Sequence, residues 1–470
     1  MGTSFTESFR ATSSLFLTES GAAPTRPVFL LGNGKDAASG ISERHQAWLR
    51  AADFKPRAGN WILLPGGAEA IEGVALGVGE NGGVSPLLAG LLPSVLPGGD
   101  YRFAAPPANA ELTATAWALG AYAYRAYQPA DTRGPRRLAL PKGAAIEEAA
   151  RIAAAIWLGR DLINTPANDL GPAELEAAAR DVAQTFSAEI AVTTGDDLLT
   201  ANFPLIHAVG RASTRSPRLI DLRWGASGPK VTIIGKGICF DTGGLNIKPG
   251  PGMALMKKDM GGAATALALA AMIMGGKLPL QLRLLIPAAE NAISGSAFRP
   301  SDIIKSRAGI TVEVVDTDAE GRLVLADALA LADAEKPDYL MTFATLTGAA
   351  RVALGPDLPP LYSTDDDLAA EFVTAGNKLG DPMWRMPLWQ PYDALLESKF
   401  AELNSMFPEP FAGSIMAALF LKRFVKNARR YAHFDIYGWT PRPQPGKPFG
   451  GEAQCARAVY DVLKKRLKLS

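Results

Sequence analysis

The sequence contains few histidines and almost no cysteine. Its three histidines, His45, His207 and His433, are far apart in the chain and form no H-E-x-x-H motif. A zinc site built on paired histidines is therefore excluded. Only two cysteines occur in 470 residues, which excludes a disulfide scaffold and suits a reducing compartment. We expect the protein to be cytoplasmic.

The chain also lacks long apolar runs and an excess of charge of either sign. No run of about 18 apolar residues occurs, so we expect no membrane span. The N-terminal segment lacks the basic and apolar parts of a secretory signal. Lys plus Arg number 48 and Asp plus Glu 47, a net charge of +1. This balance provides no field that would attract nucleic acid or an anionic membrane.

The length of 470 residues exceeds that of one typical core, because domains usually have roughly 100 to 200 residues. We predict two domains, with the boundary in the turn-rich, basic stretch at residues 128–143. Residues 1–143 would form a small α/β domain, with helices at 42–51 and 110–127 and no catalytic constellation. Residues 144–470 would form the larger, catalytic domain.

Strand-like and helix-like segments alternate in the larger domain. A long helix is predicted at 144–162. Apolar, strand-like runs lie at 230–240, 281–286, 312–315, 339–345 and 431–436. Helical stretches lie between and after them at 261–274, 321–334, 366–379 and 413–425. This alternation predicts an α/β fold with a mostly parallel or mixed sheet between helix layers. Sites in such folds form at the carboxyl ends of strands.

One such strand end carries an unusual set of charges. Asp316, Asp318, Glu320 and Arg322 lie between a strand-like run and a helical one. Acids at alternate positions of an extended chain point largely to one side, and their repulsion disfavours folding unless a cation joins them. An acid-rich first turn of a helix is the alternative, since the helix dipole favours it. This stretch alone leaves both interpretations open.

Two further segments place charges just after predicted strands. Lys236 and Asp241 interrupt the apolar run at 230–240, and Asp259 directly precedes a helix rich in small residues. An ion pair between Lys236 and Asp241 would explain the first segment, and a helix N-cap would explain Asp259. The phosphate-binding pattern G-x-x-x-x-G-K-[ST] does not occur at Lys236.

Taken together, these segments supply four carboxylates at strand ends or helix starts, from Asp241, Asp259, Asp318 and Glu320. They carry about four negative charges at pH 7, which two divalent cations would neutralise. Oxygen ligands suit magnesium, manganese or zinc. These four carboxylates therefore predict a site for two metal ions.

Three segments, GKGICFDTGGLNIK, MKKDMGGAA and DTDAEGRLVLADAL, resemble in order and spacing the signatures of the leucine aminopeptidase family, also called cytosol aminopeptidases. The resemblance spans about residues 160–439 and includes RDLINTPANDLGP, FATLTGAA and YAHFDIYGW. It implies a metal-dependent aminopeptidase that removes the N-terminal residue from peptides with a water activated by two metal ions. It also implies a homohexamer loaded with Mn²⁺, Zn²⁺ or Mg²⁺.

The resemblance assigns roles to individual residues. Metal ligands would be Lys236, Asp241, Asp259, Asp318 and Glu320, with Asp241 and Glu320 bridging the two ions. Lys248 and Arg322 would be the catalytic side chains. Lys248 would stabilise the tetrahedral intermediate, and Arg322 would hold bicarbonate, the general base. The substrate would bind a metal through its free α-amine and lie beside the Leu346 carbonyl.

The chain departs from the family pattern at Asp316, where the family has Asn, and at residues 401–405, where Asp-x-x-Asn is usual. For Asp316 we favour a local hydrogen bond over a role in substrate preference. Two other functions remain open, a two-metal phosphoesterase and a non-catalytic scaffold on the same fold. The lysine ligand and the Lys248/Arg322 pair favour the peptidase, and a scaffold would be expected to lack a ligand.

Overall fold

The computed structural model describes residues 4–18, 25–32, 40–67, 70–79, 85–129, 131–140 and 145–468. The chain folds into two compact units, which we describe separately. Unit 1 consists of Met1–Thr6, Leu158–Pro441 and Gly450–Ser470, and unit 2 of Glu7–Trp157 and Arg442–Phe449. The predicted boundary between residues 143 and 144 lies outside the described residues and stays a prediction.

Unit 2 is built on a six-stranded sheet with the order β1-β6-β5-β2-β4-β3. Its strands are β1 (Phe16–Thr18), β2 (Arg26–Gly32), β3 (Trp61–Pro65), β4 (Ile71–Gly79), β5 (Gly99–Phe103) and β6 (Arg136–Leu140). Neighbouring strands are parallel except β3 and β4. The first helices of the chain are α1 (Phe5–Ser13), α2 (Glu43–Ala51), α3 (Leu92–Val95), α4 (Ala110–Gly120) and α5 (Ile146–Asn164).

The structure confirms the predicted helices near residues 42–51 and 144–162, as α2 and α5. The helix predicted at 110–127 ends earlier, at Gly120. Gly120 touches the backbone of the segment before α3, where a Cβ atom on Gly120 would lie 1.7 Å from the Gly90 carbonyl oxygen. The apolar residues beyond Gly120 are therefore not a continuation of α4. Tyr122 is buried and packs edge-on against Trp157.

Unit 1 contains a nine-stranded mixed sheet with the order β16-β15-β18-β14-β9-β11-β8-β7, and β10 pairs with β11. These strands are β7 (Glu189–Thr194), β8 (Arg218–Trp224), β9 (Lys230–Gly235), β10 (Gly237–Asp241), β11 (Gln281–Asn291), β14 (Tyr339–Ala344), β15 (Pro360–Ser363), β16 (Trp384–Arg385) and β18 (Tyr431–Asp435). The central strands β11, β9, β14 and β18 are mutually parallel. Small sheets are formed by β12 (Ile303–Lys305), β13 (Thr311–Glu313) and β17 (Leu403–Asn404), and by β19 (Trp439–Thr440) and β20 (Gly450–Gly451).

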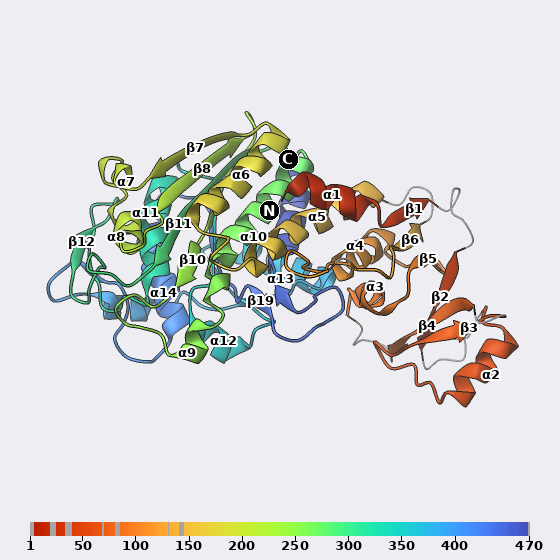
Figure 1. The fold of residues 1–470 in the computed structure, drawn as a ribbon. Coiled ribbons are helices and arrows are strands. Elements are labelled where there is room, and N and C mark those ends of the chain that lie inside the picture. The colour runs from red at the N-terminus through yellow and green to blue at the C-terminus, as the bar shows by residue number, and fades with distance from the viewer. Residues whose placement is uncertain are drawn as a thin grey trace. The chain divides into compact units, whose positions relative to one another are not determined.

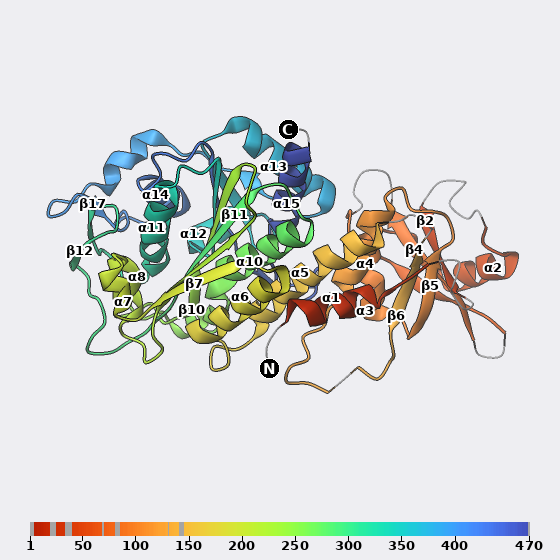
Figure 2. The same cartoon turned by 90° about the horizontal axis from the view of Figure 1, so that it is seen from above.

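Helices cover both faces of this sheet, as predicted. Figures 1 and 2 show α6, α10, α13 and α15 on one side and α8, α11 and α14 on the other. The helices of unit 1 are α6 (Pro172–Phe186), α7 (Asp197–Thr200), α8 (Pro204–Gly210), α9 (Gly250–Met253), α10 (Gly261–Gly275), α11 (Glu320–Asp333), α12 (Gly348–Leu354), α13 (Asp366–Leu379), α14 (Gly413–Lys422) and α15 (Ala456–Lys468). One large apolar cluster lies between the sheet and helices α8, α11 and α14.

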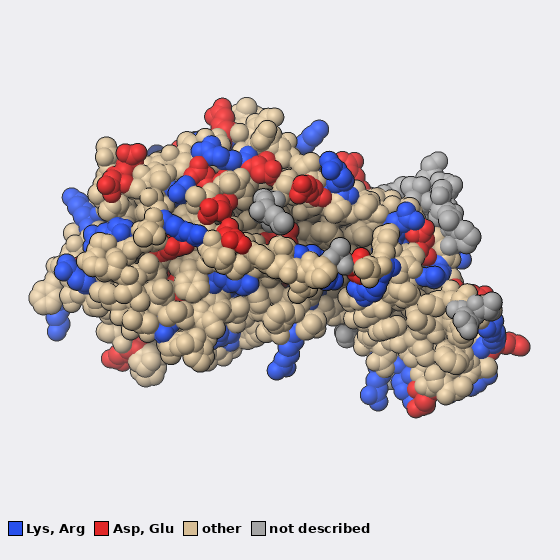
Figure 3. Space-filling model, in the orientation of Figure 1, with Lys and Arg blue, Asp and Glu red and all other residues tan. Residues whose placement is uncertain are grey.

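Among the described residues, no helix has the length and apolar character needed to span a membrane. Basic and acidic side chains are intermixed over the face shown in Figure 3. This distribution agrees with the balanced composition of the sequence.

Helix α10 is buried almost throughout and meets the sheet through glycine. A Cβ atom on Gly262 would lie 2.2 Å from the Phe343 carbonyl oxygen in β14 and 2.9 Å from the Lys236 amide nitrogen. This close approach lets the Ala263 N–H donate to the Lys236 carbonyl oxygen over 2.8 Å. The first turn of α10 therefore fixes the turn between β9 and β10.

We predict that Gly262→Ala lowers the free energy of unfolding by about 1–3 kcal/mol, because the added methyl group overpacks this contact. The measurement is the denaturant midpoint of the purified variant. Gly348→Ala is the matched control, since a Cβ atom there meets nothing within 4 Å, and its midpoint should be unchanged or slightly higher. Equal midpoints for the two variants would contradict this account of the contact.

Candidate active site

The predicted site residues come from the carboxyl ends of strands and the starts of helices. Asp241 ends β10, and Glu320 begins α11. Asp259 lies in the 3-10 helix η3 (Met256–Met260), directly before α10. All three acids are buried. They offer carboxylate oxygens that lie within 4.8 Å of one another.

Lys236 lies between β9 and β10 and reaches into this cluster. Its Nζ is 2.7 Å from Asp259 Oδ2 and 2.8 Å from Glu320 Oε1, and it donates to the Thr345 carbonyl oxygen over 3.1 Å. Its own backbone N–H donates to the Phe343 carbonyl oxygen over 2.9 Å. A Cβ atom on Gly321 would lie 2.5 Å from Lys236 Cε. Glycine after Glu320 is therefore what allows the lysine side chain to pass.

Lys248 brings the fourth predicted acid to the cluster. Its Nζ is 2.9 Å from Asp241 Oδ2 and also donates to Asp318 Oδ1. The loop before it turns at Gly243 and Gly244, whose φ angles of +85° and +64° favour glycine. The structure thus brings together all four predicted acids and both predicted lysines.

Burial and mutual repulsion perturb the acids of this cluster. Burial raises the pKa of Glu320 well above its usual range, and the charge of Asp241 adds to the effect. The same two causes raise the pKa of Asp318 to about 7. For Lys236, burial lowers the pKa, but the charges of Asp259 and Glu320 outweigh it and raise the pKa above its ordinary value. Without other cations, the lysines carry the positive charge that offsets these acids.

This donor set fits divalent metal ions. Asp259 Oδ2 and Glu320 Oε1 are buried, and the one cation that pairs with them among the described residues is the Lys236 ammonium, at 2.7 and 2.8 Å. One ammonium group shared between two buried carboxylates leaves a net negative charge, which a divalent cation would offset. Carboxylate oxygens and an amine are ligands that manganese and zinc accept. The chemistry of these residues is therefore compatible with a divalent metal ion.

Arg322 is buried in the first turn of α11. Its Nη1 donates to the Ser405 carbonyl oxygen over 3.0 Å, and its Nε has no hydrogen-bond partner among the described residues. Burial lowers its pKa to about 10, so the guanidinium stays charged at pH 7. Ser405 lies in the segment 401–405, which departs from the family pattern. That segment thus positions the predicted catalytic arginine.

Asp316 forms local hydrogen bonds. Its Oδ1 accepts from Asn246 Nδ2 over 2.7 Å and from the Asp318 backbone N–H over 2.8 Å. These bonds agree with the role favoured from the sequence. They also join the Asp316–Asp318 turn to the loop that carries Lys248.

Sequence reasoning missed two buried side chains that support the site. Asn291, the last residue of β11, donates to Asp241 Oδ1 over 2.8 Å. Asp435, the last residue of β18, accepts from the backbone N–H groups of Leu346 and Thr347 over 2.9 and 3.1 Å. Its other oxygen accepts from Thr347 Oγ1 over 2.7 Å and from Ser414 Oγ over 3.0 Å. The sequence signals were a position at a strand end for Asn291, and for Asp435 also its place in the segment YAHFDIYGW.

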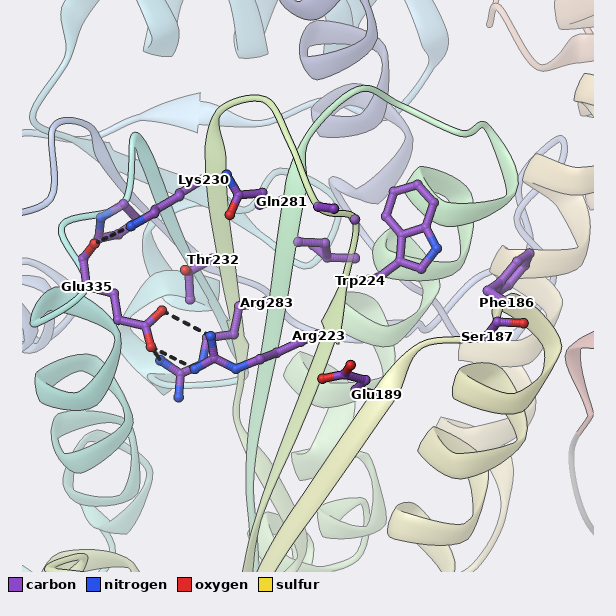
Figure 4. Close-up of a pocket in the computed structure, with 14 residues that line it drawn as sticks. Phe186, Ser187, Glu189, Arg223, Trp224, Lys230, Thr232, Gln281, Arg283 and Glu335 are labelled. Atoms are coloured by element: carbon purple, nitrogen blue, oxygen red, sulfur yellow. Dashed lines mark hydrogen bonds and ion pairs between the residues drawn. The ribbon is translucent and has the colours of Figure 1, made fainter.

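A groove of about 840 Å³ lies at the end of the sheet opposite the site, where strands β9 and β11 begin. Its walls include Lys230 and Thr232 at the start of β9 and Arg283 near the start of β11, whereas the site lies where these strands end. Figure 4 shows Arg223, Arg283 and Glu335 turned toward one another, and both arginines pair with Glu335. We assign the groove to a structural ion-pair network and not to the chemistry.

Comparisons with known proteins show which family the chain resembles. The model of the cytosol aminopeptidase family, catalytic domain, matches residues 157–459, and an aminopeptidase N-terminal domain model matches residues 33–141. A probable cytosol aminopeptidase from Roseiflexus castenholzii is 37% identical over 473 residues, covering 97% of this chain and 90% of that protein.

Solved structures give the same result. The cytosol aminopeptidase from Coxiella burnetii is 44% identical, with a TM-score of 0.89 over 97% of this chain and 100% of that chain. The bottromycin maturation enzyme BotP, solved in complex with Mn, is 30% identical, with a TM-score of 0.85 over 94% of this chain and 100% of that chain.

The fold and the carboxylate-rich site define a two-domain α/β metallo-aminopeptidase, a hydrolase. The chain belongs to the cytosol aminopeptidase family. The family, the fold class and the enzyme class predicted from the sequence are thereby confirmed. Neither the phosphoesterase nor the scaffold alternative is favoured.

We predict that Asp435→Ala lowers kcat/KM for leucine p-nitroanilide by roughly 10- to 100-fold, the usual effect of losing a supporting hydrogen-bond partner. The reason is that the loop at residues 345–348 would lose the carboxylate that accepts its hydrogen bonds. Ser414→Ala removes only one of the four donors and should cost less than about 3-fold in kcat/KM. Steady-state kinetics of both variants test this. Equal losses would show that Asp435 does not hold the loop.

Proposed function

We propose that the protein removes N-terminal residues from peptides with two divalent metal ions held by Lys236, Asp241, Asp259, Asp318 and Glu320. The observation that carries the proposal is the buried cluster of Asp241, Asp259 and Glu320, whose oxygens lie within 4.8 Å of one another. The Mn complex of BotP supports manganese. Zinc and magnesium suit the same oxygen ligands.

The chemistry that such ions supply when bound is activation of a water for attack on the peptide carbonyl and capture of the substrate's free α-amine. Lys236 would join them as a ligand only in its neutral form. The carboxylates alone raise its pKa, so this role requires the positive charge of the ions to reverse that effect. Asp241 and Glu320 would bridge the ions.

Lys248 and Arg322 are proposed to act on the reacting groups directly. Burial opposes the charged form of Lys248, but Asp241 and Asp318 raise its pKa above the ordinary value, so its ammonium can stabilise a developing oxyanion. Among the described residues, none accepts a hydrogen bond from the buried Nε–H of Arg322. A planar bicarbonate ion, acting as the general base, would satisfy it.

We further propose a homohexamer located in the cytoplasm, as the family resemblance implies. Several large apolar side chains of unit 1 are exposed, and subunit contacts would bury those that form contiguous patches. They include Val352, Trp384, Trp389, Phe400 and Phe411. The two relatives named as cytosol aminopeptidases support the location.

Metal removal is the first test. We predict that the purified protein hydrolyses leucine p-nitroanilide when Mn²⁺ is added and loses this activity with a chelator, because the four acids need divalent cations to assemble the site. Release of nitroaniline is followed by absorbance. Parallel assays use p-nitrophenyl phosphate. Turnover of the phosphate ester alone, or of neither substrate, would refute the proposal.

Two substitutions separate metal binding from catalysis. We predict that Glu320→Ala lowers both the metal content and the activity by roughly 100-fold or more, since it removes a bridging ligand. Lys248→Ala should keep the metal content and lower kcat by roughly 10²- to 10³-fold, the usual effect of losing an oxyanion donor.

Elemental analysis after dialysis and steady-state kinetics measure the two effects. Glu409→Ala, at an exposed acid, is the control and should match the wild type. Full activity of Glu320→Ala, or loss of metal from Lys248→Ala, would contradict the assigned roles.

A further inference from the structure

Two cations, Lys258 and Arg351, lie against the ring of Tyr437. Lys258 Nζ is 4.7 Å from the ring centroid, and Arg351 Cζ is 5.4 Å from it. The Lys258 residue is only 6% exposed. In the part of the chain that the structure describes, neither cation forms an ion pair with a carboxylate. Like charges so close together, one of them buried, disfavour folding unless an anion joins them.

The other lysines of this region show the contrast. Lys236 and Lys248 each contact two carboxylates. Lys257, the neighbour of Lys258, donates to the Asn164 carbonyl oxygen over 2.6 Å. Lys258 contacts the face of an aromatic ring, and the carboxylates of Asp259 and Asp435 act on it through space without forming an ion pair among the described residues. Both interactions stabilise a cation less than a charged hydrogen bond does. The buried ammonium group is thus available to an anion from outside the chain.

The three groups come from segments that build the active site. Lys258 directly precedes Asp259 in η3, and Tyr437 follows Asp435 by two residues. Arg351 lies in α12, the helix that begins at the end of the loop held by Asp435. Thr347, Arg351, Tyr437 and the acid Asp435 line one small pocket of about 10 Å³, room for a single water. A carboxylate would therefore bind outside this pocket, beside the exposed Arg351 side chain.

We propose that Lys258, Arg351 and Tyr437 form a subsite for a carboxylate of the peptide substrate. This inference rests on the proposed function. An Arg fork and a Lys ammonium together suit a carboxylate. A peptide whose α-amine is held at the metal site offers this group in two ways. One is the side chain of an N-terminal Asp or Glu, and the other is the C-terminal carboxylate of a short peptide.

The test compares kcat/KM for matched substrates of the Mn²⁺-loaded enzyme. Glu-p-nitroanilide against Gln-p-nitroanilide probes the side-chain carboxylate, and Leu-Gly against Leu-Gly-amide probes the C-terminal one. The readout is the ratio of the charged to the neutral substrate within each pair. We expect this ratio to fall about 10-fold or more in one pair for Lys258→Met, as for loss of a charge-assisted hydrogen bond.

Two further variants keep the test sharp. Arg351→Gln changes an exposed side chain, so the fold should tolerate it, and it should lower the same ratio. Lys257→Met is the matched control, because that lysine already has a backbone acceptor, and it should keep the wild-type ratio. Unchanged ratios in both pairs for Lys258→Met and Arg351→Gln would overturn the subsite alone. A wild-type enzyme that hydrolyses none of the four substrates would overturn the proposed function, and the subsite with it.

Discussion

The balance of charge among buried groups at the carboxyl end of the sheet is the constraint on which the catalytic unit depends. Asp241, Asp259 and Glu320 are nearly inaccessible to water, and the cost of burying an isolated carboxylate is large. Lys236 and Lys248 offset these charges when no other cation is present. The same arrangement leaves acceptors that divalent ions can use. Folding and metal binding therefore draw on one set of electrostatic contacts.

Close backbone contacts hold this set of charges in place. The start of α10 approaches β9 and β14 closely enough to require Gly262, and the Lys236 side chain passes over Gly321. Asp435 fixes two consecutive backbone N–H groups of the loop after β14. Asp241, Glu320 and Arg322 thus stand on a strand and a helix, which position side chains more accurately than loops do. The loop that carries Lys248 is held by its hydrogen bond to Asp316.

Much of unit 1 could be predicted because its strands are continuous apolar runs and its helices begin next to charged motifs. Helix α13 has the predicted bounds of residues 366–379. The four acids could be found because each follows a strand or begins a helix. Asn291, Ser405 and Asp435 could not, since they act through hydrogen bonds to partners 50 to 89 residues away. A single polar residue at a strand end carries no local pattern that reveals such a partner.

Segments near both ends of the chain pack against helices of unit 1. The Phe5 N–H donates to Asp181 Oδ2 over 3.0 Å, and the Phe5 ring packs against Phe186. At the other end, α15 packs against α10 and α13. Helix α15 ends nearly two hundred residues after α10. During synthesis it therefore emerges from the ribosome long after α10. Until then the nascent chain exposes an apolar helix surface of the kind that chaperones shield.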